Sequence, residues 1–383
     1  MSKPGPTDVE RAFAAMSIAL GVKPGNSTSI IQGALSGEMA RAITRHRLSR
    51  LVVNSPHPVE LEAADLETVT NDALAHTHAA FQLVGHTTHV ARLLEEGNID
   101  FLVIKGIALG ALSQTPAGRG AGDVDILVDP TDVPRVHEVF RAGGFRPALA
   151  LPDVTAPRTW RVWQYFDREA TYVGHNTHID LHWRISSQRR LFPDFATLSS
   201  RATTVSVADS TIPTLSQADS LAAACYHAYF DQFQPLRSMV DVVMLIRSVD
   251  PGTLSPTLSR RLTALMAGVI GLVADVLPGV VDTEAAALLA VLPTPPRIVR
   301  QRFDRALRSP KVAWEERQHT GDLLAKLRAE AHFDSPIDAL PRFIGKRLFD
   351  FPTWSPERTS TTLLTAATRR WRVESSRRRP TRT

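Results

Sequence analysis

The stretch FLVIKGIALGALSQTPAGRGAGDVDILV, residues 101–128, decides the fold of this chain. Its pattern predicts a strand, a glycine turn, a short helix, a glycine-rich loop and a second strand, in that order. The second strand carries Asp123 and Asp125, and because side chains alternate along a strand, both carboxylates project from one face. Two neighbouring carboxylates repel each other unless a cation lies between them, and Mg²⁺ binds such pairs together with phosphate oxygens. The stretch therefore predicts a divalent-cation site on one face of a sheet.

A second group of polar side chains lies on a predicted hairpin. Residues 160–173 are rich in aromatic and branched side chains and predict a long strand, which a Gly-His-Asn turn connects to an antiparallel partner at 177–185. On the partner strand, His178, Asp180 and His182 share one face. Beside the first two aspartates, Asp180 is interpreted as the third carboxylate of a Mg²⁺ site. Two histidines and a carboxylate are also ligands that Zn²⁺ accepts, and this alternative stays open.

These motifs, taken in chain order, resemble the signature of the uncharacterised nucleotidyltransferase family, which is part of the polymerase-β-like nucleotidyltransferase superfamily. The resemblance rests on Lys105 and Gly106, on Arg119, on GDVDILV at 122–128 and on HIDLHW at 178–183. It implies an α+β fold, in which a polymerase-β-like core with a small mixed sheet is flanked by N-terminal and C-terminal helical regions. It also implies an enzyme that moves a nucleotide from an NTP to an acceptor.

The chemistry implied by the resemblance is phosphoryl transfer assisted by two Mg²⁺ (or Mn²⁺) ions. Asp123 and Asp125 would bridge the two ions, and Asp180 would share one of them. Either Asp180 or His182 would take the proton of an acceptor hydroxyl. The NTP is then a co-substrate, and pyrophosphate is the product that leaves.

The same resemblance places the nucleotide beside four residues, Lys105, Gly106, Arg119 and Gly122. Lys105 and Arg119 would supply positive charge to the phosphates, and Gly106 would permit close approach of the backbone. A solvated lysine at the end of a strand is the alternative interpretation of Lys105. The superfamily usually has a Gly-Ser turn here, where this chain has Lys-Gly as the resembling family does. The family often has an aromatic residue in the loop, and this chain has none. A catalytically silent binding module with the same fold is therefore an alternative hypothesis.

The composition is that of an ordinary globular protein. The chain has 383 residues, of which 43% are hydrophobic and 22% are charged, and it predicts more than one module. Cys225 is the single cysteine, which excludes an intrachain disulfide and favours a reducing compartment. No apolar run is long enough for a membrane span, and the N-terminus lacks the apolar segment of a signal peptide, so we expect a cytoplasmic protein. The expected division is into an N-terminal helical region, the core, a C-terminal helical region and a basic disordered tail, at 1–98, 99–215, 216–368 and 369–383.

The sequence does not identify the acceptor substrate. A small molecule, a peptide or protein and an RNA end are all compatible with the predicted chemistry. From residue 369 onward the tail holds seven arginines and one acid, Glu374, so its net charge is +6 and the preceding residues, with +5 for the whole chain, are near −1. An arginine-rich tail can bind RNA, which keeps an RNA-directed enzyme as an alternative; a solvated tail is the preferred interpretation.

Helices are predicted on both sides of the core. The N-terminal part predicts helices at 8–20, 29–51 and 58–96, and the C-terminal part predicts helices at 219–229, 235–248, 255–276, 283–292, 296–307 and 312–330. The first of the C-terminal helices carries His227, and the next carries Arg237 and Asp241, which either pair with each other or line the acceptor side of the cleft. Within the core, Asp129 before Pro130 predicts a helix N-cap. Two extended segments are predicted at 145–151 and 200–215.

Overall fold

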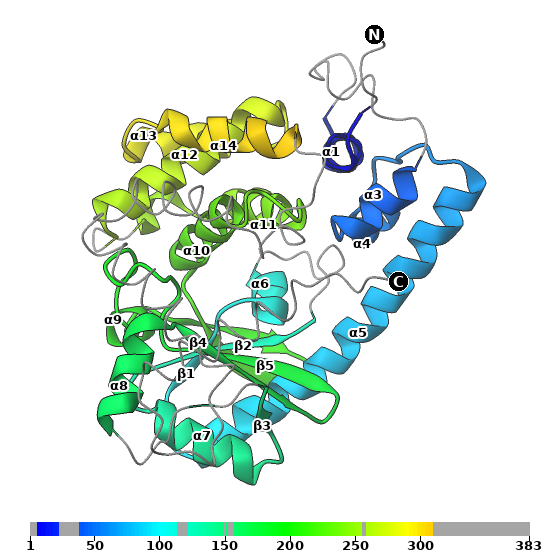
Figure 1. Ribbon diagram of the computed structural model, residues 1–383. Helices are drawn as coiled ribbons and strands as arrows, with labels where there is room; N and C mark the ends of the chain where they lie inside the picture. Colours follow the sequence, from blue (N-terminus) through cyan, green and yellow to red (C-terminus); the bar gives the residue numbers. More distant parts are fainter. Residues whose placement is uncertain are drawn as a thin grey trace, which may run out of the picture.

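The computed structural model describes residues 6–22, 38–112, 122–148, 151, 157–254 and 258–308, and the description below refers to these parts of the chain (Figure 1). Their centre is a mixed sheet with the strand order β3-β4-β5-β2-β1-β7-β6. The strands are β1 (Phe101–Val103), β2 (Val124–Val128), β3 (Arg146–Pro147), β4 (Glu169–Gly174), β5 (Thr177–His182), β6 (Thr203–Val207) and β7 (Ser210–Thr214).

The pairing of the central strands follows directly from the predicted motifs. Strand β1 pairs antiparallel with β2, and β4 pairs antiparallel with β5. The two hairpin-like units meet because β2 and β5 run parallel, in a register that sets Asp125 opposite Asp180 and Val124 opposite Ile179. Strand β7 adds to the other side of β1 in a parallel direction. The predicted α+β class with a mixed sheet is confirmed.

The sheet is surrounded by helices whose bounds are as follows. The N-terminal helices are α1 (Asp8–Ala19), α3 (Met39–Arg45), α4 (Ser49–Asn54) and α5 (Ala63–Glu96). The core contains α6 (Gly106–Leu112), α7 (Val133–Ala142), α8 (Pro157–Phe166) and α9 (Phe195–Ser199). The C-terminal helices are α10 (Gln217–Phe230), α11 (Arg237–Ile246), α12 (Arg260–Val276), α13 (Asp282–Val291) and α14 (Arg297–Leu307), with a 3₁₀ turn at Pro251–Thr253. None of the helices in the described ranges is long and apolar enough to cross a membrane.

The two faces of β2 belong to different hydrophobic cores, because its side chains alternate. Val124, Ile126 and Val128 pack with the buried side chains of α5, α7 and α8. Leu127 points the other way and joins the core formed by the N-terminal and C-terminal helices. Asp125 has the same parity as Leu127, so its carboxylate lies on the face of the sheet that is turned toward the α10 side of the molecule.

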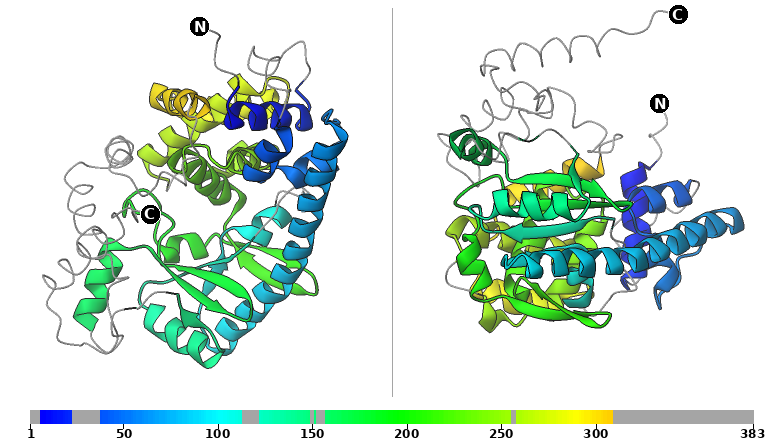
Figure 2. Two further views of the ribbon diagram at one scale, coloured as in Figure 1. Left: turned by 45° about the vertical axis from the view of Figure 1, so that its right-hand side comes forward. Right: turned by 90° about the horizontal axis from the view of Figure 1, so that it is seen from below.

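The N-terminal and C-terminal helical regions pack together as one body, although the sequence separates them by the whole core. Figure 1 shows α1 beside α14, and the Phe13 and Phe303 rings meet edge to face with centroids 5.6 Å apart. The Thr7 hydroxyl donates to the Leu307 carbonyl at 2.9 Å. The long helix α5 runs from this helical body along the sheet, as both views in Figure 2 show. The helical body therefore has a rigid connection to the sheet.

The prediction of one strand over 160–173 is wrong. The segment is helix α8, a short break and then β4. Trp160 and Trp163, three residues apart, lie on one face of α8, and Trp163 packs against Trp183 with ring centroids 4.7 Å apart. Burial of an aromatic helix face outweighs the strand propensity of these residues. Arg184 then caps the end of α8, donating to the backbone carbonyls of Gln164, Tyr165 and Asp167.

Several predicted helix boundaries also need correction. The predicted helix at 29–51 is α3 followed by α4, with Arg47 at a positive φ of 56° between them; residues 29–37 lie outside the described ranges. Helix α5 begins at Ala63 and not near Pro58. Asp129 is not a helix N-cap: its carboxylate accepts from the Thr131 amide and hydroxyl at 2.8 and 2.6 Å, a local turn, and α7 follows Asp132.

The predicted extended segments differ as well. The expected arm at 200–215 is the hairpin β6–β7, which extends the sheet beyond β1. The expected strand at 145–151 is only the two residues of β3. The helices at 219–229, 235–248, 255–276, 283–292 and 296–307 are confirmed as α10 to α14 with shifts of a few residues; residues 312–330 and the basic tail lie outside the described ranges.

Candidate functional site

The site is built around Asp125, in the middle of the buried strand β2. Asp125 is 4% exposed, and its position opposite Asp180 brings two carboxylates to adjacent parallel strands. The residues before and after each aspartate are apolar and pack on the other face of the sheet, and this packing holds the register of β2 and β5. Asp180, by contrast, is half-buried. The sheet register thus creates the pair of acids that the sequence motifs predicted separately.

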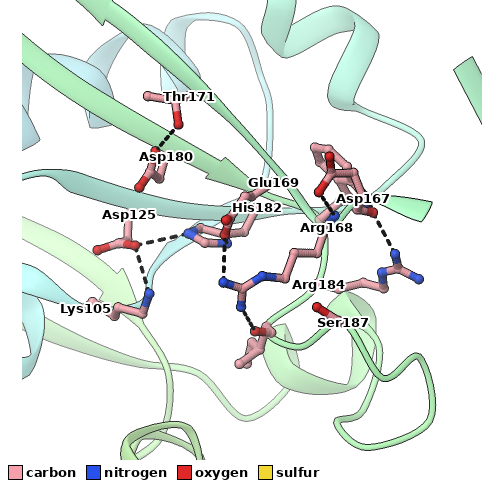
Figure 3. Close-up of polar contacts among 12 residues, drawn as sticks. Lys105, Asp125, Asp167, Arg168, Glu169, Thr171, Asp180, His182, Arg184 and Ser187 are labelled. Carbon is pink, nitrogen blue, oxygen red and sulfur yellow. Dashed lines mark hydrogen bonds and ion pairs between the residues drawn. The ribbon is translucent and has the colours of Figure 1, made fainter. Parts of the chain in front are cut away.

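Two cationic groups bind a single oxygen of Asp125. The Lys105 ammonium donates to Oδ1 at 3.1 Å, and Nε2 of His182 lies 3.0 Å from the same oxygen (Figure 3). Lys105 reaches this position because Ile104, the residue before it, donates its amide to the Asp125 carbonyl at 3.1 Å. The second carboxylate oxygen, Oδ2, has no hydrogen-bond donor among the described residues. Asp125 therefore offers one free oxygen in an otherwise closed environment.

His182 is fixed at both ring nitrogens. Its Nδ1 lies 3.1 Å from Oε2 of Glu169, the residue directly opposite on β4, and the side chain is only 1% exposed. Nε2 lies at hydrogen-bonding distance from Asp125, whereas Nδ1 faces Glu169 in an ion-pair contact and makes no hydrogen bond among the described residues. Burial alone would lower the pKa of His182, but the contacts with Asp125 and Glu169 outweigh it and raise the pKa.

The contacts continue to Arg168 and form a chain of alternating charge. Arg168 places Nη2 3.1 Å from Oε2 of Glu169 and donates from Nη1 to the Ile185 carbonyl at 2.8 Å. The order is Lys105, Asp125, His182, Glu169 and Arg168, as Figure 3 shows. We call these five residues the relay. Three positive and two negative groups leave the relay with an excess of one positive charge.

The acids of the relay are held in their ionised form. Burial would raise the pKa of Asp125, yet Lys105 and His182 together lower it below the ordinary range. Burial acts in the same direction on Glu169, and there Arg168 and then His182 lower the pKa well below its usual value. Both shifts follow from opposite charges at hydrogen-bonding distance in a partly dry site.

Asp180 has a different environment, although it stands opposite Asp125. Its Oδ1 accepts from the Thr171 hydroxyl at 2.6 Å, and Oδ2 has no donor in the described part of the chain. Burial raises the pKa of Asp180, and the negative charges of Asp125 and Glu169 act in the same direction, against the Thr171 hydrogen bond. Asp180 is thus the acid of the site with the greatest tendency to take up a proton.

The other predicted site residues are less closely connected. Asp123 stands on the bend before β2, partly exposed, with no hydrogen bond or ion pair in the described ranges. Gly106 is the first residue of α6, with a φ of 56° that favours glycine. Gly122 is exposed, and a Cβ there would meet nothing within 4 Å. Arg119 lies outside the described ranges.

The alternative of a zinc set on β5 finds no support in this geometry. His178 is exposed near the start of the strand, whereas His182 is buried and its Nε2 already contacts Asp125. The described ranges contain no group of three or more histidine, cysteine, aspartate or glutamate side chains placed to hold a metal ion. Arg189 and Arg190 are exposed, and the Arg189 guanidinium stacks over the Tyr165 ring at 4.7 Å.

Two relay residues, Arg168 and Glu169, were missed by the sequence argument. The predicted three-residue turn would pair His182 with position 168; in the structure Gly174 pairs with Thr177, which sets Glu169 opposite His182. His227, which the sequence placed on a helix without a role, approaches the relay from α10. Its Nε2 is buried with no hydrogen-bond partner among the described residues, and burial, then Lys105 and Arg168, hold its pKa well below the usual value. A neutral imidazole therefore faces the site from the helical region.

The chain is similar to a described protein family and to a solved structure. The model of a family described as "Uncharacterised nucleotidyltransferase" matches residues 35–270, which include the relay and α10. None of the curated proteins compared with the chain matches it. Among solved structures, the crystal structure of an antigenic nucleotidyltransferase-like protein from Paracoccidioides brasiliensis is similar, with 16% sequence identity and a TM-score of 0.39. The similarity covers 57% of this chain and 96% of that chain.

Proposed function

Because this chain belongs to the family of uncharacterised nucleotidyltransferases, we propose that it transfers a nucleoside monophosphate from an NTP to an acceptor hydroxyl. The acceptor oxygen forms a bond to the α-phosphorus, the bond between the α-phosphorus and the bridging oxygen breaks, and pyrophosphate leaves with that oxygen. The hydroxyl proton goes to a base on the protein. The acceptor is a small molecule, a peptide or protein, or an RNA end.

One observation carries the proposal: two facing carboxylates each keep an oxygen that has no donor among the described residues. Asp125 binds Lys105 and His182 through Oδ1, and Asp180 binds Thr171 through Oδ1, so Oδ2 of each is available to a ligand. Like charges on adjacent strands cost free energy. Asp125 and Asp180 face each other in spite of this repulsion, so the pair favours a catalytic site over a silent module.

The donor set fits a hard divalent cation. Mg²⁺ takes oxygen ligands and is usually held by one or two carboxylates together with substrate phosphates. Asp125 and Asp180 would supply these carboxylates, and Asp123, two residues before Asp125 on β2, would add a third as the ligand binds. Mg²⁺ or Mn²⁺ bound there would neutralise the phosphate charge and lower the pKa of the acceptor hydroxyl.

The residues of the chain divide the remaining tasks. Asp180 is the proposed base, because burial raises its pKa and its Oδ2 has no donor among the described residues. His182 is less suited to that task, since its Nε2 is already held by Asp125 and its Nδ1 faces Glu169. The Lys105 ammonium is partly exposed and next to the acids, a position from which it would contact the phosphates. Arg119 and the backbone beside Gly106 and Gly122 remain proposed phosphate contacts.

The test is thermal unfolding with each of the four NTPs, with and without Mg²⁺. A ligand at 100 times its Kd stabilises the folded state by about 2.7 kcal/mol, which gives a measurable rise in Tm. We expect a rise that needs both NTP and Mg²⁺ and that disappears in Asp125→Asn. Asp129→Asn is the matched control, because Asp129 only closes a local turn.

The same experiment can fail in two informative ways. An unchanged rise in Asp125→Asn would remove Asp125 from the cation site. No rise with any NTP would reject nucleotide binding by the isolated chain and favour the silent module. Where a rise is found, the preferred NTP labelled at the α-phosphate then reports transfer to candidate acceptors.

A further inference from the structure

We propose that Glu169 is a positioning residue for the cation site, anchored by Arg168. In this role Glu169 fixes His182, His182 fixes one oxygen of Asp125, and the other oxygen of Asp125 is thereby directed to the cation. The inference rests on the proposed function, since it assigns a task to residues that do not themselves contact cation or nucleotide.

The contacts of this chain are short, and two carboxylate oxygens are shared: Oε2 of Glu169 lies beside both Arg168 and His182, and Oδ1 of Asp125 lies beside both His182 and Lys105. The Glu169 carboxylate lies 3.1 Å from His182 Nδ1, and His182 Nε2 lies 3.0 Å from Asp125 Oδ1. The imidazole is 1% exposed, so water cannot replace either contact. Because the two acceptors lie on opposite edges of the ring, the ring can satisfy both only in the observed orientation.

The strand pairing supports the same conclusion. Glu169 and His182 are direct cross-strand partners on β4 and β5, and His182 is the strand neighbour of Leu127 on β2, two positions from Asp125. Arg168, just before β4, holds Glu169 from the far side while bonding the Ile185 carbonyl after β5. Three adjacent strands thus carry the contacts, and Figure 3 shows them leading in one direction to Asp125.

Removal of Glu169 would change the charges around His182. The imidazole would then lie near the cations Lys105 and Arg168 with Asp125 as its one remaining acidic contact. The ring would be free to turn, and Asp125 would be free to rotate and share either oxygen with Lys105. Outer-shell partners of this kind typically contribute about 10- to 100-fold to metal affinity.

The experiment measures Mn²⁺ binding by the full chain, with the free ion followed by electron paramagnetic resonance. Titrations are run with Mn²⁺ alone and with α,β-methylene-ATP, which cannot release pyrophosphate. We expect Glu169→Ala to raise the Kd for Mn²⁺ by about 10- to 100-fold. Glu169→Gln should stay within about threefold of wild type, because its amide oxygen keeps a polar contact beside His182 Nδ1.

Two controls separate positioning from folding. Glu138→Ala removes an exposed glutamate on α7 and should leave the Kd unchanged. Asp219→Asn breaks a buried ion pair outside the site, and below its Tm it should lower stability without changing the Kd. Positioning predicts that the Gln variant rescues affinity, which a general loss of stability would not produce.

The outcomes distinguish this inference from the proposed function. Equal Mn²⁺ affinity in wild type and Glu169→Ala, with binding lost in Asp125→Asn, would overturn the role of Glu169 and leave the cation site intact. A Gln variant as weak as the Ala variant would also overturn positioning by hydrogen bonding. Wild-type chain that binds no Mn²⁺ in either titration would overturn the cation site and, with it, this role.

Discussion

Two buried aspartates of this protein are bonded in opposite ways. Asp219, at the start of α10, is 0% exposed, and both of its oxygens are in use. Arg201 donates to Oδ2 and Oδ1, each at 2.6 Å, and Ser216 adds a hydrogen bond to Oδ2 at 2.7 Å. Asp125, 4% exposed, has both donors on Oδ1 and none on Oδ2 within the described residues.

The difference separates a structural contact from a candidate site. Asp219 joins α10 to Arg201, which follows α9. Both of its carboxylate oxygens accept hydrogen bonds there. A buried acid with an unused oxygen gives up stabilisation that a further donor would provide. A buried polar atom that lacks a hydrogen bond is expected where a ligand supplies the missing partner, and Asp125 fits that expectation.

The contact between the N-terminal and C-terminal helical regions is likewise a structural one. His46, fully buried between these regions, accepts a hydrogen bond at Nδ1 from the Leu236 amide at 3.3 Å. Burial lowers the pKa of His46 to about 4, so the imidazole is neutral at physiological pH. Here too a buried polar side chain connects two elements of the fold. Protonation of the imidazole would weaken this connection.

The largest effect on stability is expected for Asp219→Asn. Removal of one partner from a buried pair leaves an uncompensated charge and costs about 3–5 kcal/mol. Asp125→Asn should cost only about 1 kcal/mol, because His182 keeps Glu169, Lys105 reaches solvent and the repulsion with Asp180 is relieved. Urea denaturation of both variants measures the difference, and equal losses of unfolding free energy would break the comparison.

A pH effect of intermediate size is expected from His46. Its pKa is about 4 in the folded chain and about 6.5 when unfolded, so the unfolded chain binds more protons between these values. Stability is therefore complete above pH 6.5 and decreases as the pH falls toward 4, by at most about 3 kcal/mol.

The difference between wild type and His46→Asn isolates this contribution, because other histidines titrate in both proteins. Asparagine keeps an acceptor near the position of Nδ1 and has no charge to gain. The unfolding free energy of the variant should decrease less between pH 6.5 and 4. Parallel curves would show that His46 is not buried in the neutral form and would weaken the assignment of this contact.

The sequence could predict the parts of the site that depend on local pattern. Alternation alone places Asp125 and Leu127 on one face of β2, and the glycine turn after β1 is visible from its residues. The opposition of Asp125 and Asp180 depends on parallel pairing between strands more than fifty residues apart. A local sequence pattern cannot predict that register. The family resemblance was the reason to expect the two motifs side by side.

The missed residues show where local reasoning fails. Trp160 and Trp163 have strand propensity, but their spacing allows one helix face to be buried, and tertiary packing decided the outcome. Assigning the whole segment to a strand concealed the break between α8 and β4, and Arg168 and Glu169 lie at that break. A role for His227 was harder to predict, since its approach to Lys105 depends on how α10 lies over the sheet.

The smallest effect is expected at Thr171. Its substitution tests whether Asp180, like Asp125, is held through one oxygen so that the other is free for a cation. The Thr171 hydroxyl holds Oδ1 of Asp180 at 2.6 Å, so Thr171→Val removes the one donor that orients this acid while the β-branched shape is kept. Because the position is exposed, unfolding free energy should change by no more than about 0.5 kcal/mol. The Kd for Mn²⁺ should rise by about threefold to tenfold, a cost of roughly one hydrogen bond, and Thr171→Ser should restore it. If Thr171→Val binds Mn²⁺ as wild type does, the orientation of Asp180 comes from the strand alone, and the contrast with Asp219 applies to Asp125 only.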